Sequence, residues 1–139
     1  GEWSSRDGRR YRQFSDCWRV DVAARPGVRW ERVEASTSLP SARSGHRVAG
    51  TGDGRALLFG GFSEDRRRRA TYLNDCHAMD LQSGAWCELR AARAPPPKRG
   101  GHLLWAAGGA LYLYGGARAR KGTDKLDVLE DLWRAEPSG

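Results

Sequence analysis

The feature that most constrains the fold is a repeat with a period of about 56 residues. The motif Arg-x-Gly-His at residues 43–46 recurs at residues 99–102, and the glycine pair at 60–61 recurs at 115–116. Two further landmarks recur at the same spacing, as Asp75 and Asp131 and as Trp30 and Trp86. Repeats of this length build similar units that pack side by side, as in a propeller or a solenoid.

Within one unit, residues 43–86, the landmarks follow a fixed order. The unit starts with Gly-His, continues with an apolar strand that ends in the glycine pair, reaches Tyr-Leu-Asn-Asp at 72–75 and Asp80, and closes on Trp86. This order resembles the kelch repeats, and the resemblance covers almost the whole chain. It implies an all-β fold in which each repeat is a four-stranded antiparallel blade of a β-propeller.

The chain holds about two and a half such units. We assign residues 1–35 to the outer part of a first blade, residues 36–90 to a complete second blade, and residues 91–139 to a third blade that lacks its outer strand. Closed propellers have about four to eight blades. The sequence therefore predicts a kelch-type propeller fragment, and a segment of a longer protein is favoured over a ring that other chains complete.

Strand positions follow from the apolar runs between turn residues. We expect residues 1–13, 62–70 and 117–127 to be loops, and strands at 14–22, 30–33, 46–50, 55–61, 71–81, 85–89, 102–106, 110–116 and 128–135. The recurring aspartates at strand ends, Asp16, Asp21, Asp75, Asp80 and Asp131, are predicted to accept hydrogen bonds from turn amides. Trp30 and Trp86 are predicted to cover the seams between blades.

Composition agrees with short strands and excludes other classes. The chain contains 18 Gly and 6 Trp and shows no sustained helical periodicity. No apolar run approaches the roughly 20 residues that a membrane-spanning helix needs. The first residue, Gly1, is neither an initiator Met nor the start of a signal peptide. Because the three cysteines are an odd number without a secretion signal, we expect a reducing, intracellular compartment, and cytoplasmic before others.

The candidate metal ligands and catalytic residues are better explained as structural. His46 and His102 occupy the same repeat position, which favours buried, hydrogen-bonded histidines over a catalytic site. In the cluster Asp75, Cys76, His77 and Asp80, strand alternation sends Cys76 and His77 to opposite faces. The sequence therefore predicts no catalytic residue, metal or cofactor. An enzyme of the galactose oxidase type, with its site in missing blades, remains an alternative by fold analogy alone.

The charge pattern indicates a binding surface. In such a blade the connections between strands two and three, and those from strand four to the next blade, emerge on one face. Seventeen of the 24 lysines and arginines fall in these connections. The predicted partner-binding residues are Arg9, Arg10, Arg12, Arg66, Arg67, Arg68, Arg69, Arg118, Arg120 and Lys121. A field of one sign attracts and steers a partner of the opposite sign.

An acidic protein segment suits this surface best, because loops on a rigid scaffold are common binding sites. Nucleic acid is not favoured, since the basic loops carry few aromatic residues and no nucleic-acid-binding motif. We expect a non-catalytic interaction scaffold that belongs to a larger assembly. The alternative is a substrate-adaptor or regulatory module of a multidomain protein, for example one that recruits clients to a ubiquitin ligase.

Overall fold

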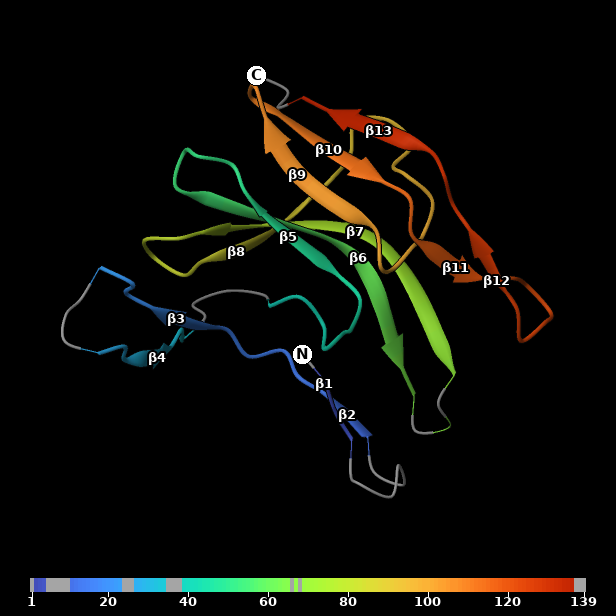
Figure 1. The fold of residues 1–139 in the computed structure, drawn as a ribbon, viewed down its shortest axis with the longest axis horizontal. Helices are drawn as coiled ribbons and strands as arrows, with labels where there is room; N and C mark the ends of the chain where they lie inside the picture. Colours follow the sequence, from blue (N-terminus) through green and yellow to red (C-terminus); the bar gives the residue numbers. More distant parts are fainter. Residues whose placement is uncertain are drawn as a thin grey trace.

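The computed structural model describes residues 2–4, 11–23, 27–34, 39–65, 67 and 69–136 of the 139-residue chain. Every regular element in these ranges is a β-strand, and the strands form twisted antiparallel sheets arranged side by side (Figure 1). The all-β prediction is confirmed. The described part of the chain contains no helix that could span a membrane.

The second blade is a complete four-stranded sheet with the order β5-β6-β7-β8. Its strands are β5 (Arg47–Gly50), β6 (Arg55–Glu64), β7 (Ala70–Asp80) and β8 (Trp86–Leu89). β6 is longer than predicted, because its end beyond the glycine pair stays paired with β7 from Gly61↔Leu73 to Glu64↔Ala70. The expected loop 62–70 is therefore wrong, and only residues 65–69 connect the two strands.

The third blade contains three strands in the order β13-β10-β9: β9 (Leu103–Ala107), β10 (Ala110–Tyr114) and β13 (Leu132–Ala135). Between β10 and β13 the chain forms a separate hairpin of β11 (Ala117–Ala119) and β12 (Leu126–Val128). The expected loop at 117–127 and the continuous strand at 128–135 are thus wrong. The hairpin lies beyond the second glycine pair, as the far ends of β6 and β7 lie beyond the first one in the second blade.

The first blade contributes the paired strands β3 (Trp18–Val20) and β4 (Trp30–Arg32). A further hairpin of β1 (Glu2–Ser4) and β2 (Tyr11–Gln13) precedes them, which corrects the prediction of a loop over residues 1–13. This hairpin occupies the repeat position of the β11–β12 hairpin. Its strands are too short and polar to show alternation, which is why the sequence did not reveal it.

The glycine pairs are required where the strands change direction. Gly60 and Gly61 have φ of 62° and 93°, a region that L side chains rarely adopt. A Cβ at Gly61 would lie 2.6 Å from the carbonyl oxygen of Ser44. At Gly116 the equivalent clash is 2.8 Å from the carbonyl oxygen of Gly100. The backbones approach so closely that no side chain fits.

Small apolar clusters hold neighbouring blades together. Leu58, Met79 and Trp86 form a buried cluster, and Cys17 and Val33 of the first blade pack against it. Trp86 therefore covers a seam between blades, as predicted, whereas Trp30 is 61% exposed and covers none in the described chain. At the other seam the ring of His102 stands edge-on to Phe59, with centroids 5.6 Å apart.

Candidate functional site

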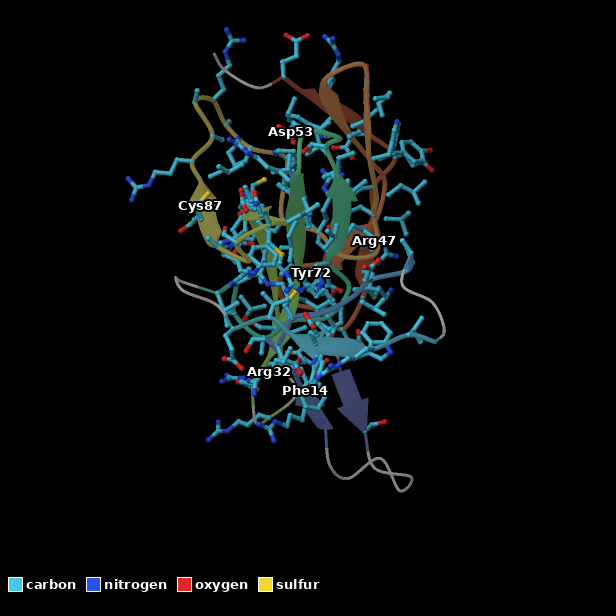
Figure 2. All side chains as sticks on the ribbon, turned by 90° about the vertical axis from the view of Figure 1, so that its left-hand side faces the viewer. Phe14, Arg32, Arg47, Asp53, Tyr72 and Cys87 are labelled. Atoms are coloured by element: carbon cyan, nitrogen blue, oxygen red, sulfur yellow. The ribbon has the colours of Figure 1, made fainter. Side chains whose placement is uncertain are left out.

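The far ends of β6 and β7 and two of the hairpins lie on one side of the sheets. The far ends of β6 and β7 and the hairpins β1–β2 and β11–β12 lie along the bottom and right of Figure 1, while the turns β5–β6, β7–β8 and β9–β10 lie at its left and top. In Figure 2, Asp53 of the β5–β6 turn lies at the opposite end of the molecule from Phe14 and Arg32. These three connections therefore lie away from the turns β5–β6, β7–β8 and β9–β10.

Arg43 does not belong to this exposed surface, because its side chain is 3% exposed and fully hydrogen-bonded. Its guanidinium donates twice to the Asp75 carboxylate, at 2.7 and 2.8 Å. It also donates to the carbonyl oxygens of Gly60 and Ser41 and to the Ser41 hydroxyl. All five guanidinium N–H groups donate hydrogen bonds within the blade. Arg43 therefore stabilises the blade and has no N–H group left to bind a partner.

Arg99 repeats the arrangement in the third blade. It donates to both carboxylate oxygens of Asp131, at 2.6 and 2.8 Å, and to the carbonyl oxygens of Gly115 and Pro97. The hydrogen bonds from Arg99 hold the pKa of Asp131 well below its usual range. Of the 17 lysines and arginines in the connections, Arg43 and Arg99 are therefore buried and not available to a partner.

These contacts also correct the roles predicted for the aspartates. Asp75 and Asp131 accept from arginines, and Asp16 accepts from the Trp18 indole. Two aspartates do accept turn amides as predicted, since Asp80 bonds the N–H groups of Gln82 and Ser83 and Asp21 bonds that of Ala23.

The histidines differ from the prediction in their hydrogen bonding. His102 is fully buried, and neither ring nitrogen has a partner among the described residues. Burial first, and then the charges of Arg47 and Arg99, lower the pKa of His102 to about 4. His46 is half-buried, and its Nδ1 likewise has no partner in the described chain. His77 contacts Asp75 at 2.8 Å. No group of three potential metal ligands occurs within the described ranges.

The candidate site is a groove between the second and third blades, with a volume of about 580 Å³. The start of β7 forms one wall and the β11–β12 hairpin forms the other, and the two elements lie side by side (Figure 1). Its lining residues are Ala70, Thr71, Tyr72, Lys98, Arg118, Ala119, Arg120, Lys121 and Asp127. Four of them are cations and one is an acid, so the groove is strongly positive.

Contacts within the groove leave part of this charge available. Asp127 accepts from Arg120 Nε at 2.6 Å and lies 3.9 Å from Arg118 Nε. Lys98 and Lys121 are exposed and make no hydrogen bond or ion pair with any residue that the structure describes. The groove thus holds four cations and one carboxylate, and among these cations that carboxylate contacts the two arginines only.

The structure brings together only some of the predicted partner-binding residues. Arg118, Arg120 and Lys121 line the groove. Arg12 lies outside the groove and stacks over Phe14. Arg69 pairs with Asp65, and the exposed Arg67 donates its backbone N–H to the same carboxylate. Arg9, Arg10, Arg66 and Arg68 lie outside the described residues.

Sequence reasoning did not include Lys98, Thr71 or Tyr72 among the binding residues. Only the spatial meeting of two blades places them beside Arg118 and Arg120.

Comparison with known proteins gives a consistent result. The family model for the KLHDC2/KLHL20/DRC7 Kelch-repeats domain matches residues 3–138. Tip elongation aberrant protein 1 of Schizosaccharomyces pombe is 32% identical over 113 residues, which is 78% of this chain and 9% of that protein. Acyl-CoA-binding domain-containing protein 5 of Arabidopsis thaliana is 34% identical over 100 residues, or 72% of this chain and 15% of its own length.

Two further similarities extend the comparison. The Rab9 effector protein with kelch motifs of Mus musculus is 30% identical over 99 residues, covering 70% of this chain and 25% of that protein. The solved structure of YjhT superposes with a TM-score of 0.61 at 22% identity, over 75% of this chain and 29% of that one. The chain spans a quarter or less of the length of these three relatives.

Proposed function

The chain belongs to the kelch-repeat family, and we propose that it is a non-catalytic interaction module whose basic groove holds an acidic segment of another protein. The observation that supports this most directly is the groove between β7 and the β11–β12 hairpin, where four cations meet one carboxylate. We further propose that the module belongs to a larger assembly, because loops on a rigid scaffold are common sites for binding other proteins.

Charge supports an acidic partner. Lys98 and Lys121 are unpaired within the described chain, and Arg118 is 3.9 Å from its carboxylate neighbour. Arginine offers planar, bidentate contacts to carboxylates, and clustered positive charge raises the rate of encounter with acidic partners. These exposed charges are screened beyond about 8–10 Å at physiological salt, so binding would weaken as salt rises.

Two further observations support a protein partner in a reducing compartment. The mouse relative is named as an effector of Rab9, which is a protein partner for that relative. Cys17, Cys76 and Cys87 are all free thiols here. We therefore propose an intracellular, cytoplasmic location for the module.

The test is the affinity for a fluorescent glutamate-rich peptide, measured by anisotropy at several salt concentrations. The triple variant Arg118→Ser, Arg120→Ser and Lys121→Ser removes three groove cations. Exposed charge pairs contribute about 0.2–1 kcal/mol each, so we expect a roughly 3- to 150-fold loss of affinity and a shallower salt dependence.

The control removes the same net charge outside the groove, by changing Arg19, Arg32 and Arg134 to Ser. These side chains pair with Glu31, Glu34 and Glu136 on the blade strands. We expect its affinity to stay within about twofold of the wild type. Equal losses in both triple variants would show that only net charge matters, and no loss in either would refute the proposed site.

A further inference from the structure

Two seams between blades provide an internal comparison of how the projecting hairpins are joined. At the first seam, Gln13 of β2 reaches across to the second blade. Its Nε2 donates to the Ser44 hydroxyl at 2.8 Å and to the Phe62 carbonyl at 3.1 Å. Its Oε1 accepts the backbone N–H of Glu64 at 2.9 Å. One amide side chain therefore closes the backbone edge of β6.

At the second seam the repeat places different residues in the same positions. Tyr72 stands 59 residues after Gln13, and the bridges Ser44↔Phe62 and Gly100↔Ala117 are equivalent. By the same register, Ala119 occupies the position of Glu64. Tyr72 does not cross the seam by hydrogen bonds to described residues; its ring packs on Phe62, with centroids 5.4 Å apart. Within the described chain, the backbone edge of β11 at the second seam therefore lacks the side-chain hydrogen bonds that Gln13 makes to the edge of β6 at the first. We call this the open edge.

The open edge presents the backbone N–H of Ala119 to the groove. Ala117 exchanges two hydrogen bonds with Gly100, away from β12, whereas Arg120 N–H bonds Lys125 across the hairpin. Alternation along a strand places the N–H of Ala119 on the same side as that of Ala117. Ala119 lines the groove, and its N–H has no acceptor among the described residues. An accessible donor of this kind calls for an acceptor from solvent or from a ligand.

We propose that a glutamate or aspartate side chain of the acidic partner enters this seam and takes the place that the Gln13 amide holds at the first one. Its carboxylate accepts the N–H of Ala119, while Lys98 and Arg118 stabilise its charge. The proposal rests on the proposed function and specifies it: the groove recognises a planar carboxylate through a backbone donor, as well as through its positive field.

Two observations favour a side-chain carboxylate as the occupant. The group that fills the equivalent position at the first seam is a planar side-chain carbonyl, that of Gln13. The acid already present in the groove, Asp127, is held by Arg120 through one carboxylate oxygen. A carboxylate differs from the Gln13 amide by its negative charge, which the groove cations complement.

The decisive variant is Tyr72→Gln, which keeps all four groove cations and restores the residue of the first seam. We expect the new amide to bond the N–H of Ala119 and to reduce affinity for the glutamate-rich peptide about tenfold or more, since a hydrogen bond to a charged group is lost. The matched control is Trp30→Gln, which introduces the same side chain at an exposed aromatic position of the first blade, outside the groove, and should bind as the wild type does. In amide exchange by NMR, Ala119 should exchange fast in the free wild type and slowly in Tyr72→Gln or with peptide bound.

A second variant, Ala119→Pro, removes the N–H directly. Proline is tolerated where the N–H of an edge strand faces outward, so the fold is retained and a loss of about tenfold is expected. If the groove-cation variant loses affinity while both Tyr72→Gln and Ala119→Pro bind as tightly as the wild type, the carboxylate contact is refuted and the proposed function stands. If the wild type does not bind the peptide, both fail. Tighter binding of a phosphoserine peptide than of the glutamate peptide would also overturn the carboxylate assignment.

Discussion

Replacing His102 by Leu should remove a specific part of the pH dependence of stability. His102 is fully buried against Phe59, and its ring nitrogens have no partner in the described chain. Burial lowers its pKa from 6.5 to about 4. The folded protein therefore keeps the ring neutral at a pH where the unfolded chain already protonates it.

The sign and size follow from linkage. Between pH 6.5 and about 4 the unfolded state binds one more proton, so stability decreases as the pH falls. Each unit of pKa difference corresponds to about 1.4 kcal/mol, and the whole window therefore costs the wild type about 3 kcal/mol. Asp75 and Asp131, whose pKa values are lowered from 3.8, contribute only below this window.

The measurement is urea unfolding of wild type and His102→Leu at pH 7.5, 6.5, 5.5 and 4.5, followed by tryptophan fluorescence. The variant should lose little at neutral pH, because an apolar side chain of similar size fits a site without hydrogen-bond partners. Its advantage over the wild type should grow by about 1 kcal/mol per pH unit below 6.5. A difference that stays constant with pH would refute the reasoning. His46→Gln, at the equivalent repeat position, retains His102 and should keep most of the wild-type slope.

Two further predictions concern stability. Arg99→Lys keeps the charge but loses the paired contacts between the buried guanidinium and the partly exposed Asp131 carboxylate, so we expect about 2 kcal/mol less stability in urea unfolding; an unchanged midpoint would contradict the assigned role. Trp86→Ala empties part of the seam that Cys17 and Val33 cover and should cost about 3–5 kcal/mol, whereas Trp30→Ala, at the exposed repeat counterpart, should cost less than 1 kcal/mol. Similar losses in the two tryptophan variants would show that exposure does not separate them.

The blades could be predicted from the sequence because the repeated residues are required by a backbone geometry that is the same in every copy. The glycine pairs mark positions of positive φ and close backbone approach, and these requirements leave a readable residue type. The hairpin β1–β2 leaves none, since strands of three residues are too short to show an alternation of apolar and polar residues. Its presence followed only from its pairing, Glu2↔Gln13 to Ser4↔Tyr11.

The arginine–aspartate pairs were readable in principle. Arg43 and Asp75 are 32 residues apart, and so are Arg99 and Asp131. Two residues of opposite charge that recur together at one separation are a signal for a contact, which the assignment of these aspartates to turn amides overlooked. The groove left no such signal, because it depends on which side chains from different blades meet across a seam.

The repeat distinguishes the residues that hold each blade together from the residues of the site that we propose. Positions that are filled alike in both copies, such as the arginine, the aspartate and the glycine pair, hold each blade together. The seam positions are filled differently: glutamine and serine close the first seam, and tyrosine and glycine leave the second open. Gln13 accepts the N–H of Glu64 at the first seam, whereas Tyr72, at the equivalent position, does not accept the N–H of Ala119. In the site that we propose, the departure at Tyr72 leaves the N–H of Ala119 without an acceptor among the described residues, and the surrounding cations favour a carboxylate in that position.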